Sequence, residues 1–206
     1  MISHHTLLLA SKSPSRHMLL QLARIPFAVI GQDADETSCD WTLPLQDVVT
    51  QIALFKMKHA VVPLGTQGQT VYVLTADTLT QGADGTIYGK PVDREDAKRM
   101  LKQTQTGSRV ATAFCLEKRK WLDGAWVTQQ QVLECVTAAY VFNVPDELLD
   151  YYLDNSPGVG CANATAVEGF GLQFLESVNG SYTAIIGLPL FELRIALKTI
   201  GFFAAD

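Results

Sequence analysis

The sequence predicts an α/β protein built on a mixed β-sheet. Apolar runs rich in β-branched and aromatic residues alternate along the chain with segments whose apolar residues recur at helical spacing. Two reversals, at Gly82–Gly85 and Lys118–Gly124, separate neighbouring strand-like segments and indicate β-hairpins. Because hairpins make antiparallel pairs, we expect a mixed sheet and not a uniform doubly wound one.

The predicted strands follow from the apolar runs. Residues 6–10 form a buried strand, and residues 70–76 (TVYVLTA) form another that we expect to end at Ala76. A second short strand then leads into the turn at Gly82–Gly85. The other predicted strands cover residues 27–30, 110–117, 126–142 and 172–178.

The predicted helices follow from start signals and apolar spacing. Ser13 followed by Pro14 is a typical helix start, with serine at the N-cap and proline at the first helical position. Met18, Leu19 and Leu22 give this helix an apolar side. The same spacing predicts helices at residues 45–62, 94–103, 145–154 and 190–200.

Length and composition narrow the class of protein. The 206 residues have 48% hydrophobic content, enough for a substantial core, so we expect residues 1–206 to form one domain with two lobes around one cleft. The net charge is −5 and no basic run is present, so duplex nucleic acid is not an expected partner. The apolar stretches are too short to span a membrane and the start lacks a signal-peptide pattern, so we expect a cytoplasmic protein.

Residues 7–20 (LLLASKSPSRHMLL) carry the pattern of an anion site. A strand, a serine-rich turn and a helix start leave backbone N–H groups pointing outward, where the helix dipole favours negative charge. Ser11 and Ser13 add hydroxyl donors, and Arg16 could reach back onto phosphate oxygens. The alternative is an ordinary capped helix with a surface arginine.

Asp77 and Lys90 are the next candidates. Asp77 follows the predicted strand 70–76, at the edge where open α/β sheets place ligands, so its carboxylate could activate water or bind a metal. Lys90 lies between Gly89 and Pro91, which would hold it as a fixed charge for phosphate. The alternatives are an aspartate that caps a turn and a solvated turn lysine.

Glu36 and Lys56 carry weaker signals. Glu36 lies in a polar loop with Asp33 and Asp35, and acidic loops are usually just solvated. Lys56 lies among apolar neighbours on a predicted helix, where a lysine either reaches outward to solvent or meets a buried anion.

These residues occur in an order that resembles the Maf family of nucleoside triphosphate pyrophosphatases. The resemblance runs from about Leu7 to Leu193 and rests on a series of motifs in the correct order. No single motif is specific. The motifs are LLLASKSPSRHMLL, Asp35–Thr37 (D-E-T), Ala53–Lys56 (A-x-x-K), Ala76–Thr78 (A-D-T), Gly89–Pro91 (G-K-P), Ala97–Leu101 (A-x-x-M-L), Glu168–Gly171 (E-G-x-G) and G-S-Y…G-L-P-L at 180–190.

The resemblance implies a fold, a reaction and roles for residues. The fold would be akin to the inosine-triphosphatase group, with two α/β lobes, an elongated twisted mixed sheet and a central cleft. The reaction would convert a nucleoside triphosphate to the monophosphate and pyrophosphate with a divalent cation, Mg²⁺ or Mn²⁺. Asp77 would be the general base, and Glu36 would help hold the metal or the water. Ser11, Arg16, Lys56 and Lys90, with Ser13, would bind the triphosphate. A homodimer is also compatible with the resemblance.

Three positions separate two subgroups of this family. The dTTP/UTP subgroup typically has arginine after S-P, threonine after the catalytic aspartate and glutamine in a later segment. The 7-methyl-GTP subgroup has tryptophan, glutamine and an E-G-F-G segment. Here Ser15 matches neither, Thr78 matches the pyrimidine group and Glu168 matches the 7-methyl-GTP group.

The segment 161–171 (CANATAVEGFG) makes 7-methyl-GTP the preferred interpretation, with dTTP/UTP or relaxed specificity as the alternative. A carboxylate at Glu168 can accept from the N1–H and amino groups of guanine and favours a positively charged methylated ring. Ser15 removes a tryptophan that could stack on such a ring. Asn163 and Thr165 replace a glycine and an aromatic residue of the family pattern.

A different class of function stays open. The substitutions at Ser15, Asn163 and Thr165 are also compatible with a nucleotide-binding regulator with weak turnover, and the family is linked to arrest of septum formation. Trp41, Trp121 and Trp126 fall in no matched motif, so we expect them to fill core and surface and not to stack on a base.

Overall fold

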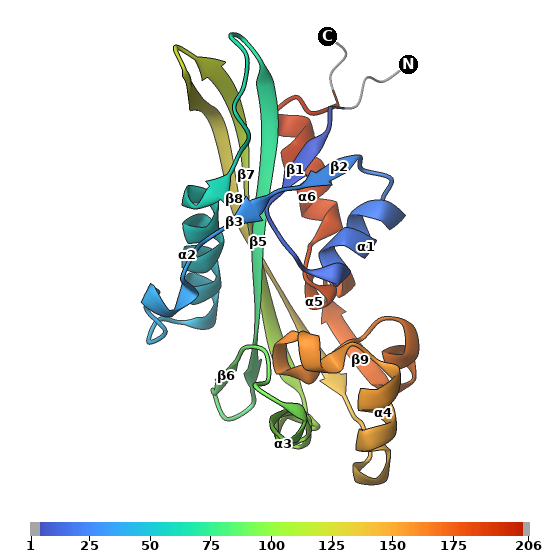
Figure 1. Ribbon diagram of the computed structural model, residues 1–206. Helices are drawn as coiled ribbons and strands as arrows, with labels where there is room; N and C mark the ends of the chain where they lie inside the picture. Colours follow the sequence, from blue (N-terminus) through green and yellow to red (C-terminus); the bar gives the residue numbers. More distant parts are fainter. Residues whose placement is uncertain (1–4, 204–206) are drawn as a thin grey trace.

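The computed structural model describes residues 5–203, and its centre is a seven-stranded sheet (Figure 1). The strand order is β2-β1-β5-β7-β8-β9, and β6 pairs with β5. The strands are β1 (Leu7–Leu9), β2 (Phe27–Val29), β5 (Thr70–Gly82), β6 (Ile87–Tyr88), β7 (Ser108–Leu122), β8 (Ala125–Phe142) and β9 (Leu175–Gly180). A separate pair is formed by β3 (Gly31–Gln32) and β4 (Ala60–Val61).

The sheet is mixed, as predicted. The short strand β1 runs parallel to both β2 and β5, whereas β6, β7, β8 and β9 join through antiparallel pairs. A long antiparallel ladder joins β5 to β7 from Thr70 opposite Lys120 to Gly82 opposite Ser108. Because β1 ends at Leu9, β5 continues well beyond its parallel neighbour, and this difference in length leaves room for a cleft.

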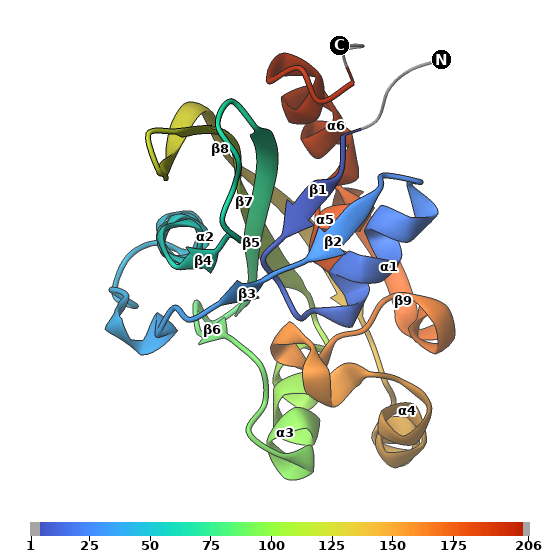
Figure 2. The same ribbon diagram turned by 45° about the horizontal axis from the view of Figure 1, so that its top comes forward.

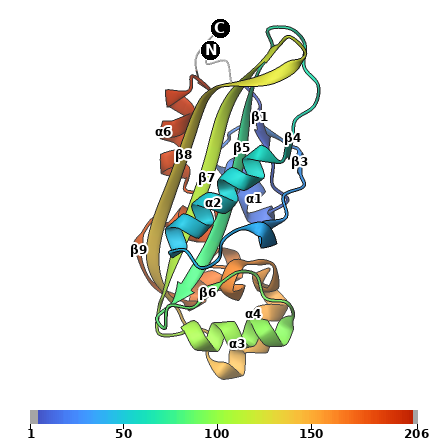
Figure 3. The ribbon, with the colours of Figure 1, turned by 90° about the vertical axis from the view of Figure 1, so that its left-hand side faces the viewer.

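Helices cover both faces of the upper sheet (Figure 3). The α-helices of the described residues are α1 (Pro14–Leu22), α2 (Leu45–Lys58), α3 (Arg94–Thr104), α4 (Leu149–Asn155), α5 (Tyr182–Ile186) and α6 (Leu190–Thr199), of which α1, α2 and α6 pack on the upper sheet. Side chains alternate along a strand, so Val73 of β5 packs on the α2 side while Tyr72 and Leu74 join the core formed with α1 and α6.

The far ends of β7 and β8 carry a second lobe (Figures 1 and 2). There α3 and α4 bury Leu101 and Tyr152 against Val110, Ala138 and Phe142 of the two strands. The long strands therefore contribute apolar side chains to the cores of both lobes. Within residues 5–203, no helix is both long and apolar enough to cross a lipid bilayer.

Several predicted boundaries are wrong. Residues 70–82 form one continuous strand, so Asp77 lies in its middle and not at its end, because β7 pairs with it along its whole length. The reversal at Gly82–Gly85 is confirmed, since it joins β5 to β6. Helix α2 stops at Lys58, after which Ala60 and Val61 pair with β3.

The C-terminal third differs most from prediction. Gly169–Phe174 forms a 3₁₀ turn, so the strand predicted at 172–178 begins only at Leu175. Helix α5, which has five residues, was not predicted. Ser181 caps its start, and Gly187 ends it at a φ of 124°, a conformation that glycine adopts without strain.

Candidate active site

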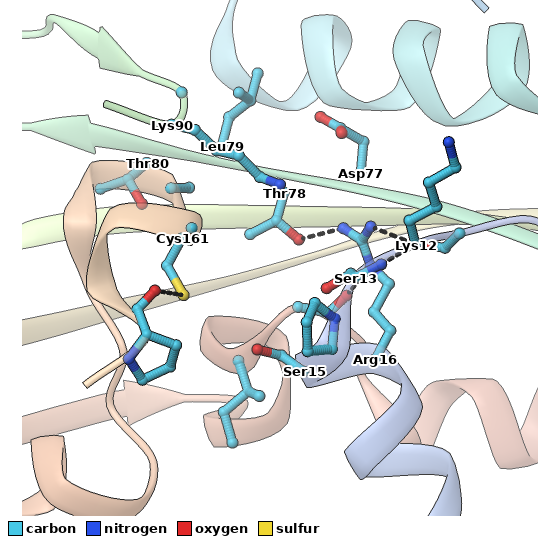
Figure 4. Close-up of a pocket in the computed structure, with 18 of the residues that line it drawn as sticks. Lys12, Ser13, Ser15, Arg16, Asp77, Thr78, Leu79, Thr80, Lys90 and Cys161 are labelled. Atoms are coloured by element: carbon cyan, nitrogen blue, oxygen red, sulfur yellow. Dashed lines mark hydrogen bonds between the residues drawn. The ribbon is translucent and has the colours of Figure 1, made fainter. Parts of the chain in front are cut away.

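A cavity of about 670 Å³ opens between the two lobes. Residues from α1, α2, β5 and the segment 157–168 all line it, so its walls come from distant parts of the chain. Figure 4 shows how several of these side chains converge. The cavity lining includes every predicted site residue: Ser11, Ser13, Ser15, Arg16, Glu36, Lys56, Asp77, Thr78, Lys90 and Glu168.

The end of β1 explains why Asp77 lies in the cleft although it is not at a strand end. The last parallel contact is the N–H of Ala10, which donates to the carbonyl of Leu74 at 2.9 Å. Beyond this point the chain turns into α1, and β5 lines the cleft from Asp77 to Thr80. The prediction placed the ligand-binding edge of the sheet at the carboxyl end of the strand before Asp77. In the structure this edge is the carboxyl end of β1 and not that of β5.

Lys56 joins two carboxylates. Its Nζ lies 2.7 Å from Asp77 Oδ1 and 2.8 Å from Glu36 Oε1. Lys56 falls on the stripe of α2 that also buries Val49, Ile52 and Ala53, so helical spacing turns it inward. The sequence left two alternatives for Lys56, exposure to solvent or contact with a buried anion, and the structure shows contact with the buried Asp77 carboxylate.

Glu36 reaches Lys56 from a short 3₁₀ turn, Glu36–Ser38. Asp35 caps this turn, because its Oδ1 accepts from the N–H of Thr37 at 3.1 Å and from the Thr37 hydroxyl at 2.6 Å. The two neighbouring acids therefore have different roles, because Asp35 caps the turn and Glu36 extends from it to contact Lys56.

Asp77 combines burial with nearby positive charge. Burial raises the pKa of its carboxyl, and the charges of Lys56 and Arg16 oppose that rise. Its second oxygen, Oδ2, is buried and has no hydrogen-bond partner among residues 5–203. A carboxylate with one oxygen held by a lysine and the other free can accept a proton from a bound water.

Arg16 is buried and fixed by three acceptors, so the alternative of a surface arginine is wrong. Its Nε donates to the Gly187 carbonyl at 2.8 Å, and its two terminal nitrogens donate to Ser11 Oγ at 3.2 Å and Thr78 Oγ1 at 3.0 Å. Burial lowers the pKa of this guanidinium, while the charges of Asp77 and Glu36 favour its cationic form. The remaining N–H donors of the fork are free for a phosphate.

The start of α1 is open for an anion. Ser13 precedes the helix at the N-cap, as predicted, but its side chain makes no capping hydrogen bond. The N–H of Ser13 donates instead to Ser11 Oγ at 3.2 Å. Within residues 5–203 the start of α1 therefore has no side-chain cap, and it lines the cavity, where a ligand anion can accept from its first free N–H groups.

Two exposed lysines complete the charge distribution. Lys90 lines the cavity from the turn before α3, and Lys12 lines it from the turn before α1. Neither lysine has an ion-pair partner within the part of the chain that the structure describes. Sequence reasoning missed Lys12, although its place between Ser11 and Ser13 in the anion motif was the available signal.

The other end of the cleft holds Ser15 and Glu168. The Ser15 hydroxyl donates to Glu168 Oε1 at 3.0 Å, and Glu168 Oε2 is buried with no partner in the part of the chain that the structure describes. Cys161 lies nearby, where burial and then the charge of Glu168 raise the pKa of its thiol to about 11. Trp41 also lines the cavity, contrary to the expectation that it only fills core and surface.

The residues present fit a divalent cation. Glu36 and Asp77 contact the same Lys56 nitrogen, so their oxygens are close together, and Asp77 Oδ2 is an unused acceptor. Among residues 5–203 no group of three or more His, Cys, Asp or Glu side chains could hold a metal. Mg²⁺ needs only one or two carboxylates when phosphate oxygens and water supply the other ligands.

Comparison with known proteins assigns the chain to a family. The family model described as "Maf-like protein" matches residues 6–200. A dTTP/UTP pyrophosphatase of Citrifermentans bemidjiense is 33% identical over 203 residues, covering 97% of this chain and 98% of the relative. Proteins of the same name from Albidiferax ferrireducens (33% identical, covering 94% and 96%) and Psychrobacter arcticus (28% identical, covering 93% and 94%) also match. The match over nearly the whole length shows that the chain belongs to the Maf-like protein family.

Proposed function

We propose that this protein hydrolyses dTTP and UTP to the nucleoside monophosphate and pyrophosphate. The observation that carries the proposal is the convergence of an acid–lysine cluster and an anion site in one cleft. Relatives that match almost end to end are named dTTP/UTP pyrophosphatases, and this supports both the reaction and the pyrimidine substrate.

Asp77 acts as the general base. Burial raises the pKa of Asp77 above that of an ordinary aspartate, so its carboxylate is a stronger base and accepts a proton from water more readily. Lys56 holds one carboxylate oxygen at 2.7 Å and so orients the free Oδ2. The water attacks the α-phosphorus, and the bond to the bridging oxygen breaks so that pyrophosphate leaves.

The cations and donors around Asp77 bind the triphosphate. Arg16 and the start of α1 supply fixed donors, and Lys12 and Lys90 supply mobile charge at the rim. Glu36 and Asp77 would hold the divalent cation, which when bound neutralises charge on the phosphates and the leaving pyrophosphate. Fixed donors of this kind stabilise the transition state because they need no reorientation during the reaction.

Ser15 reconciles Glu168 with a pyrimidine substrate. A carboxylate with two free oxygens suits the paired N–H donors of guanine, but Ser15 already donates to Oε1. The remaining acceptor, Oε2, fits the single N3–H of uracil or thymine. Thr78, the residue typical of the pyrimidine subgroup, lies in the same cleft and accepts from Arg16.

7-methyl-GTP is the second candidate, since Glu168 would favour a positively charged methylated ring. A regulator that binds nucleotide with weak turnover is the third possibility. A kinetic panel of UTP, dTTP, CTP, GTP and 7-methyl-GTP with Mg²⁺ or Mn²⁺, read as pyrophosphate release, separates all three. We expect the highest kcat/KM with UTP and dTTP. A preference for 7-methyl-GTP would support the second candidate, and tight binding without product would support the third.

A further inference from the structure

One end of the cleft is lined by uncharged hydroxyl groups that no step above uses. Thr80, Tyr140 and Thr165 line the cavity there, and further buried polar side chains stand behind them. Figure 4 shows Thr80 beyond Thr78 along β5, on the side of Cys161 and away from Asp77. We call the following residues the hydroxyl cluster: Thr80, Thr104, Ser108, Tyr140, Asn163 and Thr165.

The antiparallel ladder assembles this cluster. Gly82 of β5 lies opposite Ser108 of β7, which lies opposite Tyr140 of β8, so the three share one row of the sheet. On the same face of the sheet, the Tyr140 phenol lies 3.5 Å from the Thr80 hydroxyl. Tyr140 is 3% exposed, so its hydroxyl is held at the cavity wall inside the protein.

Asn163 supports the cluster from behind. Its Nδ2 donates to Thr104 Oγ1 at 2.8 Å and to Thr165 Oγ1 at 3.3 Å, and its backbone N–H donates to the Gly89 carbonyl at 2.8 Å. Its Oδ1 is buried near the Tyr140 hydroxyl, with no partner at hydrogen-bond distance among the described residues. Asn163 and Ala164 both have left-handed backbones, with φ of 55° and 53°, which is unfavourable for alanine.

Such strain persists only where the surrounding contacts enforce it, and it is typical of binding sites. The chain here adopts a costly conformation, and the segment that contains it brings the Thr165 side chain to the cavity wall. The side chain of Asn163 is fully buried, so it does not contact solvent, and its hydrogen bond to Thr165 holds that residue in position.

The cluster has hydrogen-bonding capacity that the protein leaves unused. The Tyr140 hydroxyl lies 3.5 Å from the Thr80 hydroxyl, which is at the limit for a hydrogen bond, and the side chains of Ser108, Asn163 and Thr165 also surround it. Thr104 and Thr165 each donate to a backbone carbonyl, whereas Ser108 Oγ and Asn163 Oδ1 are buried with no hydrogen-bond partner among the described residues. The contact between Tyr140 and Thr80 is long, so a ligand oxygen at the cavity wall would accept a better hydrogen bond from either hydroxyl.

We propose that Tyr140 and Thr80 form a recognition subsite for the nucleobase, donating hydrogen bonds to a base carbonyl oxygen. The cluster contains no charged group, so it suits the neutral part of a nucleotide and not its phosphates. Glu168 Oε2 lines the same cavity and accepts one N–H. An acceptor beside hydroxyl donors is complementary to the N3–H and carbonyls of uracil or thymine. This inference rests on the proposed function, because it names the part of the substrate that the cluster reads.

The test compares ligands that differ only in the nucleoside. Calorimetric titrations in EDTA use three probes: inorganic tripolyphosphate, ribose 5′-triphosphate and uridine 5′-[α,β-methylene]triphosphate. Tyr140→Phe removes one hydroxyl, and Thr80→Val removes its neighbour without changing shape. Tyr88→Phe is the matched control, because Tyr88 is also buried but its hydroxyl binds Gln103 outside the cavity.

We expect Tyr140→Phe and Thr80→Val to weaken binding of the uridine analogue about three- to tenfold, as loss of one neutral hydrogen bond does. Binding of tripolyphosphate and ribose 5′-triphosphate should stay unchanged, and Tyr88→Phe should change none of the three. If the variants weaken binding of ribose 5′-triphosphate as much as binding of the uridine analogue, the cluster contacts the sugar and the inference is wrong. If Tyr140→Phe does not fold, Thr80→Val decides alone.

The two proposals fail in different ways. If the parent releases pyrophosphate from UTP but neither variant changes affinity for the uridine analogue, the subsite is wrong and the proposed function stands. If the parent binds no nucleotide and releases no pyrophosphate, both are wrong.

Discussion

Replacing Lys56 with methionine should be strongly destabilising, and replacing Glu36 with glutamine should not. The side chains of Lys56 and Asp77 are 9% and 10% exposed, whereas that of Glu36 is 40% exposed, although both carboxylates contact the same amine. Breaking a buried pair leaves an uncompensated charge and costs about 3–5 kcal/mol. Breaking the contact to the exposed partner costs less than about 1 kcal/mol.

Urea unfolding monitored by tryptophan fluorescence measures both variants. The double variant Lys56→Met/Asp77→Asn is the control, because it removes both buried charges and should be more stable than Lys56→Met alone. Equal losses for Lys56→Met and Glu36→Gln would refute the reasoning, since exposure would then not decide the cost. A double variant no more stable than Lys56→Met would also refute it.

Three further predictions follow from the site. The kcat/KM should fall at low pH as Asp77 gains a proton, and the midpoint of this fall should lie above 3.8, the ordinary pKa of an aspartate. Lys56→Met should move the midpoint to higher pH, because the charge of Lys56 opposes the rise in the pKa of Asp77, and a midpoint that moves to lower pH contradicts this. Arg16→Lys should raise KM and lower the free energy of unfolding by about 1–3 kcal/mol, because one amine cannot reach three divergent acceptors; parent-like KM and stability contradict this. Ser15→Ala should free Glu168 Oε1 and raise kcat/KM for 7-methyl-GTP severalfold relative to UTP, and an unchanged ratio contradicts the role given to Ser15.

Much of the candidate site could be predicted because its residues lie in short local motifs. Helical spacing alone places Lys56 on the buried stripe of α2, and the serine-rich turn before α1 indicates an anion site. Asp77 lines the cleft as expected, but it lies in the middle of β5 and not at the end of a strand as predicted. It faces the cleft because β1 ends early beside a longer β5, and strand length depends on pairing with β7 that no local pattern shows.

The contacts that sequence reasoning missed join residues far apart in the chain. Ser15 and Glu168 are separated by 153 positions, and Arg16 and Gly187 by 171. Helix α5, which ends at Gly187, is too short for an apolar period to appear. The hydroxyl cluster arises because Ser108 and Tyr140 become neighbours in the sheet, and the register of a long ladder determines that contact.

Hydrolysis of UTP in ¹⁸O-labelled water tests the central claim most directly. If Asp77 directs water to the α-phosphorus, the parent yields UMP carrying one ¹⁸O and unlabelled pyrophosphate. Asp77→Asn should then form product about 10²–10⁴ times more slowly, the contribution typical of a general base. Label in the pyrophosphate, release of UDP and inorganic phosphate, or an Asp77→Asn variant as fast as the parent would contradict the account.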